Sequence, residues 1–218
     1  MAHNEDTRVK IPALLHLTRL GYTYFSLKDS SYTIDWETNI LINIFRDQFL
    51  KINKMSDKSE DDLKVFENEF QNMSLELWQD DLWKQFYNRL LNKWNSNYKL
   101  IDRDNFNNNT FHVCTELTCK NWEDEFRPDI TVFVNGLPLS FIEVKKPNNH
   151  EGIRAERDRI NTRFKNSAFR KFINITQLLV FSNNMEYDDT GIDQLQWAFY
   201  ATTTRNSSIK FNNFREEL

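Results

Sequence analysis

The sequence predicts an α/β (α+β) domain, in which helices flank a mixed central sheet and a mostly helical region precedes it. Apolar residues recur at helical spacing through most of the first half of the chain, and the spacing changes to strand-like alternation near residue 111. After that point, segments with strand character stand on both sides of one helical segment. This order of elements indicates one sheet with helices packed against it.

The composition is that of a chain able to form one sizeable core. It has 218 residues, 39% of them hydrophobic, with a net charge of −4 and a pI near 5.6. This balance excludes a global positive field, so any nucleic-acid surface must be a local basic patch. The charged start of the chain and the lack of an apolar run of roughly 18 residues argue against a signal peptide and a membrane span. We therefore expect a cytoplasmic protein with no membrane contact, whose cysteines Cys114 and Cys119 are free thiols.

Three helical segments are expected in the first half. The stretch IPALLHLTRLGY predicts a short amphipathic helix, with Pro12 in its first turn and Gly21 at its end. TYFSLKDSSYTIDW then has extended character, a second helix is expected from Glu37, and a third runs from about Leu63 to Trp94. The expected inward-facing residues of the second and third helices are Ile40, Ile44, Phe45, Phe49, Phe66, Phe70, Met73, Leu77, Phe86, Leu90 and Trp94.

The second half predicts the sheet. TFHVCTELTCK alternates as a strand does, and RPDITVFVNGLPLSFIEVKK predicts a β-hairpin around Asn135-Gly136. EGIRAERDRINTRFKNSAFRKF returns to helix, and ITQLLVFSNN and LQWAFYATTT predict two more strands. We expect residues 111–204 to form the core of a single domain that spans residues 1–218, with residues 37–100 as a largely helical insertion.

The hairpin carries charged residues on otherwise apolar strands. Alternate residues of a strand share a face, so Glu143 and Lys145 point the same way. A strict two-residue turn would place Asp129 opposite Ile142, on the other face from Glu143. One extra residue in the loop, or a bulge near Pro138, brings Asp129 opposite Glu143 instead. Which of these irregularities occurs between residues 134 and 139 is left open by the sequence.

Two carboxylates held side by side predict a cation between them. Asp129 and Glu143 would repel each other otherwise, and Mg²⁺ or Mn²⁺ is the ion that suits oxygen ligands. Such an ion polarises a phosphoryl oxygen, and Lys145 can stabilise the developing negative charge. We therefore expect metal-assisted phosphodiester hydrolysis in a cleft open to solvent. The alternative is that these charges only face water on a half-exposed strand, because Glu-x-Lys alone is a weak signal.

Pro128-Asp129 followed by Glu143-Val144-Lys145 resembles the signature of the PD-(D/E)XK nucleases. The wider sequence of the second half is similar to the N-terminal nuclease region of the R (HsdR) subunits of type I restriction enzymes, and so is LLHLTRLGY near the start. The resemblance implies a restriction-endonuclease-like fold and DNA cleavage. It also implies Asp129, Glu143 and the Val144 backbone carbonyl as metal ligands, and Lys145 as the catalytic lysine.

An acidic residue from an early helix completes the metal site in many nucleases of this superfamily. Glu37 is the candidate here, with Glu5 and Asp35 left open. The Gln-x-x-x-Tyr motif of some R subunits does not occur in the helical segment after Lys145.

No Gly-x-x-x-x-Gly-Lys-Ser/Thr loop exists among the four glycines of the chain. We therefore expect a fragment of a longer chain that lacks the ATPase motor. ATP would act only through the motor of the full-length subunit and would not bind here. The implied partners are double-stranded DNA and the modification and specificity subunits.

The segment after the hairpin is the expected local basic patch. Phosphate contacts need cationic side chains without base-specific geometry. The expected DNA-binding residues are Lys146, Arg154, Arg157, Arg159 and Arg163, and Lys165, Arg170 and Lys171 extend the patch. The alternative is a solvated face, or arginines paired with the acidic residues between 57 and 81.

Two functions from different classes remain open. The first is a metal-dependent endonuclease domain of a type I site-specific deoxyribonuclease, which reads no sequence of its own. The second is a non-catalytic module that grips DNA or assembles the restriction complex. A zinc site at His112, Cys114 and Cys119 is disfavoured, because three ligands on one short strand do not surround a tetrahedral ion.

Overall fold

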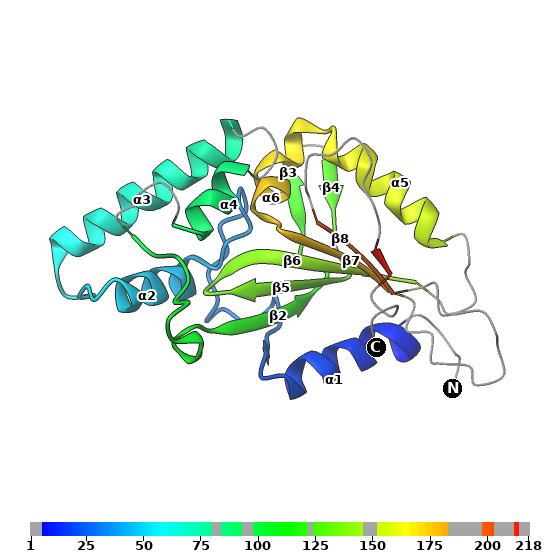
Figure 1. The fold of residues 1–218 in the computed structure, drawn as a ribbon, viewed down its shortest axis with the longest axis horizontal. Coiled ribbons are helices and arrows are strands. Elements are labelled where there is room, and N and C mark those ends of the chain that lie inside the picture. The colour runs from blue at the N-terminus through cyan, green and yellow to red at the C-terminus, as the bar shows by residue number, and fades with distance from the viewer. Residues whose placement is uncertain are drawn as a thin grey trace.

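The chain folds around a mixed sheet, as Figure 1 shows. The computed structural model describes residues 6–79, 84–92, 98–121, 124–145, 152–182, 198–202 and 212–213. Within them the strands follow the order β1-β2-β5-β6-β7-β8-β9, with β1–β2 and β6–β7 parallel and the other neighbours antiparallel. The strands are β1 (Thr23–Tyr24), β2 (Phe111–Thr115), β5 (Ile130–Val134), β6 (Leu137–Val144), β7 (Leu178–Ser182), β8 (Ala198–Thr202) and β9 (Asn212–Asn213). The predicted α/β class with a mixed sheet is confirmed.

The helices lie around this sheet, and two further strands form a separate small ladder. The helices are η1 (Asp6–Lys10, a π-helical turn), α1 (Ile11–Arg19), α2 (Ile42–Ile52), α3 (Glu60–Gln79), α4 (Lys84–Leu90), η2 (Phe106–Asn108), α5 (Gly152–Phe164), η3 (Ser167–Phe169) and α6 (Arg170–Ile175). The ladder pairs β3 (Cys119–Asn121) with β4 (Asp124–Phe126). None of the helices in the described ranges is both long and apolar enough to cross a membrane.

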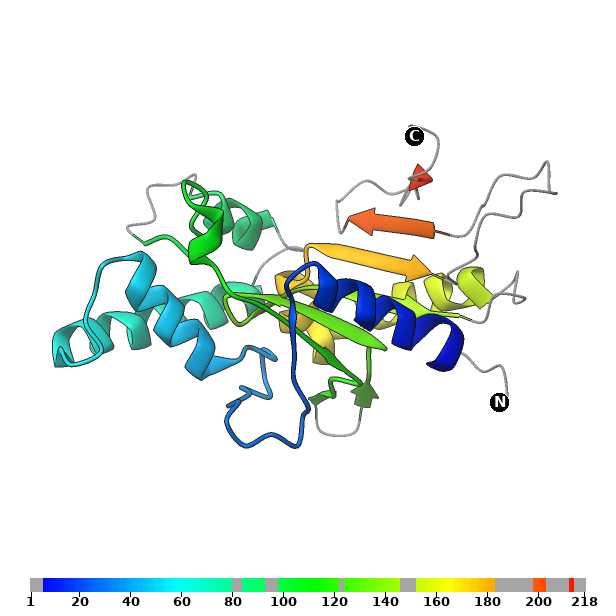
Figure 2. The same ribbon diagram turned by 90° about the horizontal axis from the view of Figure 1, so that it is seen from below.

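The two faces of the sheet have separate apolar cores. On one face, Val113, Ile130, Val132 and Val144 are buried with Val9, and the residues of α1 pack over them. The larger core lies on the other face, where the aromatic residues of α2, α3 and α6 meet the strand residues Phe133 and Phe141. In Figure 1, α1 and α5 accordingly lie on opposite sides of the strands, and Figure 2 shows α1 running along the sheet.

The first half of the chain departs from the sequence predictions at three places. α2 begins at Ile42, because Glu37 lies in a turn in which Asp35 Oδ2 accepts hydrogen bonds from the Thr38 amide and hydroxyl groups. In the predicted extended segment, only the short β1 and an isolated bridge between Ile34 and Leu41 are strand-like, and the rest is turns and irregular chain. The single helix expected from Leu63 to Trp94 is α3 and α4, while Trp94 lies outside the described residues.

The second half keeps the predicted order but divides two elements. The strand expected over TFHVCTELTCK is β2 and β3, separated at Glu116, whose φ of 55° interrupts an extended chain. The helix expected over residues 151–172 is divided into α5, η3 and α6. The hairpin of β5 and β6 and the strands β7 and β8 lie where they were expected.

The hairpin turn is anchored to its surroundings by neutral hydrogen bonds. Asn135 and Gly136 have φ values of 51° and 81°, the left-handed conformation of a two-residue hairpin turn. The Asn135 side chain is fully buried, and it accepts from the Thr110 amide and donates to Asn109 Oδ1 and Leu100 O. The Gly136 carbonyl accepts from the Leu41 amide at the start of α2. The turn is therefore fixed in place from two sides.

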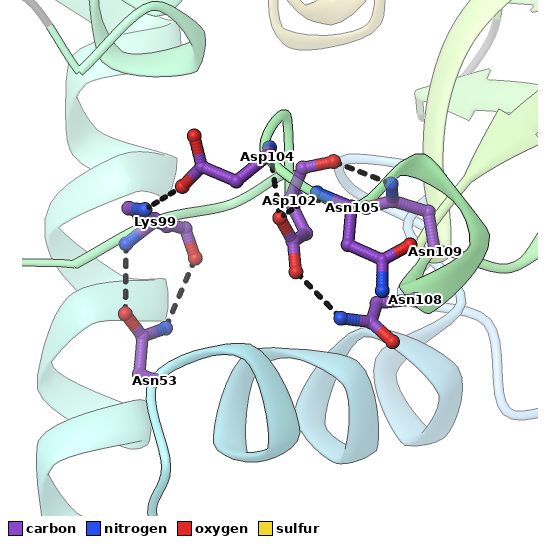
Figure 3. Close-up of polar contacts among 7 residues, drawn as sticks. All are labelled: Asn53, Lys99, Asp102, Asp104, Asn105, Asn108 and Asn109. Atoms are coloured by element: carbon purple, nitrogen blue, oxygen red, sulfur yellow. Dashed lines mark hydrogen bonds and ion pairs between the residues drawn. The ribbon is translucent and has the colours of Figure 1, made fainter.

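The Asn-rich run between residues 105 and 110 is part of this anchor. Asn109 is 6% exposed, and its amide group donates to the Asp102 and Phe106 carbonyls and accepts from the Asp102 amide. The Asp102 carboxylate in turn accepts from the Asn105 amide and the Asn108 side chain (Figure 3). What the composition presents as a low-complexity patch is an ordered polar loop that holds Asn135.

Candidate active site

The register of the hairpin brings the predicted carboxylates to the same face. Ile130 pairs with Ile142 and Val132 with Ser140, but Phe133 pairs with Pro138, so Leu139 has no partner in β5. The turn has two residues and the bulge at Leu139 supplies the shift. Continued by one residue, this register puts Asp129 opposite Glu143. The predicted irregularity is confirmed, in its bulge form.

Asp129 lies directly before β5 and is fixed by both of its carboxylate oxygens. Oδ2 accepts a hydrogen bond from the Val144 amide at 2.8 Å, and Oδ1 lies 3.5 Å from the Lys10 ammonium. The Asp129 side chain is 16% exposed. The Val144 contact links the start of β5 to the end of β6, so the carboxylate is held against the backbone that carries Glu143.

Glu143 is the more buried of the two predicted carboxylate ligands, at 4% exposure. This differs from the expected cleft open to solvent, because β6 is an internal strand that β5 and β7 flank, and Glu143 pairs with Phe181 of β7. β6 ends at Val144, and Lys145 follows it, partly buried. The Lys145 ammonium donates to the Val144 carbonyl at 2.8 Å, the same oxygen that the resemblance assigns to a metal.

Lys10 is a second ammonium at this end of the hairpin. Its Nζ lies 2.5 Å from Glu116 Oε1 and 3.3 Å from Asp6 Oδ1, in addition to the contact with Asp129. Burial alone would lower the pKa of the Lys10 ammonium, but the hydrogen bond to Glu116 and the charges of Asp129 and Glu116 outweigh it and raise the pKa above its ordinary value. The ammonium is therefore a permanent positive charge beside Asp129.

The donor set suits a hard divalent cation. Asp129 and Glu143 supply carboxylate oxygens, and Val144 supplies a carbonyl oxygen. Mg²⁺ is commonly bound through one or two carboxylates while it retains several waters. Within the described ranges no group of three or more acidic, histidine or cysteine side chains is arranged to hold a metal. The site therefore fits an ion that keeps water ligands and does not fit a closed protein cage.

Glu37 differs from the prediction. It does not head a helix, and its carboxylate pairs with the Lys171 ammonium at 2.6 Å. Lys171 also donates to Ser74 of α3 and is 9% exposed, so it belongs to the packing between α6 and α3 and not to a basic surface. Sequence reasoning misassigned Lys171 because its neighbours in the chain are basic, whereas its partners lie far away in sequence.

The structure describes only some of the residues of the predicted basic patch. Arg159 and Lys165 are exposed, while Arg163 is partly buried, with its guanidinium carbon 4.4 Å from the centre of the Phe126 ring. Arg170 donates to the Trp78 carbonyl. Lys146 lies outside the described residues, as do the side chains of Arg154 and Arg157.

The two cysteines are free thiols, as expected, and both are buried. Burial raises the pKa of the Cys119 thiol well above its ordinary value, with further contributions from Cys114 and Glu143 that Arg163 opposes. Burial also raises the pKa of the Cys114 thiol. Both thiols are therefore protonated at neutral pH and unsuited to act as nucleophiles.

Lys10 and Glu116 are the residues that sequence reasoning missed at this site. Lys10 follows a buried Val9 in a short π-helical turn, and Glu116 follows the end of β2. They are far apart in the sequence and belong to no recognisable motif. The only local signal is the charge of Lys10 beside an otherwise apolar helix start.

Comparison with known proteins gives consistent results. Residues 2–207 match the family model described as the type I restriction enzyme R protein N terminus. From Methanocaldococcus jannaschii, a protein named as the MjaIXP endonuclease subunit of a type I restriction enzyme is 26% identical over 202 residues, which are 84% of this chain and 19% of that protein. A second, named as the MjaVIIP endonuclease subunit, is 45% identical over 60 residues, 26% of this chain and 6% of that protein. The chain thus spans about a fifth or less of the length of these relatives. Because the family model covers nearly the whole chain, the protein belongs to the family of type I restriction enzyme R protein N-terminal regions.

Proposed function

We propose that the chain is the metal-dependent DNA endonuclease domain of a type I restriction enzyme R subunit. Asp129, Glu143 and the Val144 carbonyl would hold Mg²⁺ or Mn²⁺, and Lys145 would act as the catalytic lysine. The single observation that supports this most strongly is the bulge at Leu139, which puts Asp129 opposite Glu143 on one face. A hairpin that served only packing would have no need of that register.

Each residue of the proposed site would have its own chemical role. A bound divalent ion would polarise the scissile phosphate and acidify a water. Asp129 is oriented for that task by the Val144 amide, and the burial of Glu143 limits competition from bulk water. The Lys145 ammonium, partly buried beside the Val144 carbonyl, is close enough to the donor set to stabilise negative charge that develops on the phosphate.

The substrate would be double-stranded DNA, gripped through phosphate. Two of the predicted contacts have side chains that the structure describes: Arg159 of α5 is exposed, while Arg163 is partly buried against Phe126. Target choice and DNA movement would reside in the modification and specificity subunits and in an ATP-driven motor of the full-length R subunit. The alternative, a non-catalytic module that only grips DNA, is disfavoured by the presence of two carboxylates and a lysine in one register.

The test combines metal binding with cleavage. Mn²⁺ titrated into the chain in a calorimeter should release or absorb heat, and Glu143→Gln should remove that signal. In the assembled enzyme, Asp129→Asn, Glu143→Gln and Lys145→Met should each reduce plasmid cleavage by about 10²-fold or more, because ligands and lysine act as one unit. Lys99→Met is a matched control, since it removes an ammonium whose ion pair with Asp104 lies in the polar loop of Figure 3.

The outcomes separate the two candidate functions. Loss of cleavage in the three site variants with normal cleavage by Lys99→Met supports the endonuclease. Full cleavage by any two of the three site variants contradicts the assignment. A chain that binds DNA but takes up no Mn²⁺ favours the gripping module.

A further inference from the structure

The Lys10 ammonium occupies a position that nothing in the proposed reaction requires. Three carboxylates surround it, those of Asp6, Glu116 and Asp129, at 3.3, 2.5 and 3.5 Å. Its side chain is 14% exposed, so the pairing is shielded from water more than a surface ion pair is. Of the three carboxylates, Asp129 alone belongs to the proposed metal site.

The backbone holds Lys10 at this position from the opposite face of the sheet. Val9, the preceding residue, is fully buried in the core that contains Val144 and Ile130. Val144 lies at the end of β6 and donates its amide to the Asp129 carboxylate. Val9 therefore packs in the same core as the residue that orients Asp129. The side chain of Lys10 then reaches the strand ends, where Glu116 and Asp129 are joined by a backbone hydrogen bond from the Glu116 amide to the Asp129 carbonyl.

A bound divalent ion and the Lys10 ammonium would compete for the Asp129 carboxylate. Asp129 Oδ2 is engaged by the Val144 amide, and Oδ1 is the oxygen that faces Lys10. A divalent ion that shares Asp129 and Glu143 would place two positive charges next to the ammonium. Lys10 retains Glu116 and Asp6 as partners if it withdraws from Asp129, so its displacement does not leave a buried charge unpaired.

We infer that Lys10 is a tethered counter-ion of the metal site: it balances and positions Asp129 when no metal is bound, and it moves onto Glu116 and Asp6 when the metal binds. This inference rests on the proposed function, because it concerns the same site. Lys10 is thus a positioning residue that sets the metal concentration at which the site fills. It would make no contact with the reacting phosphate.

The test measures metal affinity in the chain and its variants. Lys10→Met retains an unbranched apolar stem and removes the charge, and its dissociation constant for Mn²⁺ should fall about tenfold relative to wild type. Even with the dielectric constant of water, Coulomb's law gives a repulsion of that order between an ammonium and a divalent ion a few ångströms apart. Lys10→Arg, which keeps the charge, should stay within about twofold of wild type, and Lys99→Met should not differ from it.

A second measurement needs no substitution. In the wild-type chain, the side-chain ammonium resonance of Lys10 in a nitrogen-15 NMR spectrum should shift as Mg²⁺ is added, while that of Lys99 should remain in place. This readout remains informative even where Lys10→Met lowers the folded fraction, and it follows the displacement itself.

The outcomes distinguish this inference from the proposed function. Tighter binding by Lys10→Met with a shifted Lys10 resonance supports the inference. Binding by the wild type with unchanged or weaker binding by a folded Lys10→Met, or a Lys10 resonance unaffected at saturating Mg²⁺, overturns the inference and leaves the nuclease proposal in place. A wild-type chain that takes up no Mn²⁺ overturns the proposed function, and the inference with it.

Discussion

The two ends of the β5–β6 hairpin satisfy their polar groups in opposite ways. At the turn end, Asn135 is fully buried and bonded to neutral partners, and the Gly136 carbonyl is bonded to the start of α2. At the open end, Asp129 and Glu143 are carboxylates, and the ammoniums of Lys10 and Lys145 lie against the donor atoms. Neutral hydrogen bonds at one end fix a register that holds like charges together at the other.

Under the proposed function, this difference predicts that the turn end supports stability and the open end supports metal binding and cleavage. A fully satisfied neutral network rigidifies a fold, because each buried donor or acceptor is costly to leave unmade. Charges that are shared among several partners can change partners without the same cost. We therefore expect substitutions at the turn end to affect the free energy of unfolding, and substitutions at the open end to affect metal binding and cleavage.

The largest effect is expected at Gly136. A Cβ there would lie 2.7 Å from the Leu41 carbonyl oxygen and 2.8 Å from the Phe45 amide, and the φ of 81° is unfavourable for any side chain. Gly136→Ala should lower the free energy of unfolding by about 2 to 5 kcal/mol, from backbone strain together with overpacking. Urea unfolding measures this change.

Gly21→Ala is the matched control for this substitution. Gly21 has a φ of 98°, but a Cβ there would meet nothing within 4 Å. Only the strain of the left-handed backbone remains, so the free energy of unfolding should fall by about 1 to 2 kcal/mol. Equal losses in the two variants would show that the contact between the turn and α2 contributes nothing.

A smaller effect is expected at Asn109, which connects the polar loop to the turn. Asn109→Ala removes four hydrogen bonds of a side chain that is 6% exposed, including the one to Asn135. The free energy of unfolding should fall by about 2 kcal/mol, because the Asn135 amide and the Asp102 backbone lose buried partners. Asn107→Ala, at an exposed position of the same run, should change it by less than about 0.5 kcal/mol. Similar losses in the two variants would mean that Asn109 contributes no more to stability than an exposed asparagine of the same run.

The sequence predicts the hairpin well and its surroundings less well. Asn135-Gly136 and Pro138 are local signals, and they predicted both the turn and an irregularity after it. They could not distinguish a longer loop from a bulge, because the turn is anchored by Asn109 and Leu100, which are distant in the chain.

The misplaced features share one physical cause. α2 starts late because Asp35 binds the backbone of its own turn and Asn39 adopts a φ of 61°, a local competition that apolar spacing does not report. Glu37 pairs with Lys171, and Lys10 with Glu116 and Asp129, across long stretches of sequence. Ion pairs of this kind leave no periodic pattern. The placement of the two carboxylates on one face was therefore predictable from the hairpin, but their counter-ions were not.

The smallest effect on stability is expected at the open end, where Asp129→Asn keeps an oxygen that can accept from the Val144 amide and removes one negative charge. Lys10 retains Glu116 and Asp6, and the repulsion from Glu143 is relieved, so the free energy of unfolding should change by less than about 1 kcal/mol. Asp129→Ala also removes the acceptor and leaves the amide of fully buried Val144 without it, which should cost about 1 to 3 kcal/mol. Urea unfolding of the pair without added metal separates the hydrogen bond from the charge. If Asp129→Asn were as destabilising as Asp129→Ala, the ion pair with Lys10 would be a main support of the fold, and the contrast between the two ends of the hairpin would be lost.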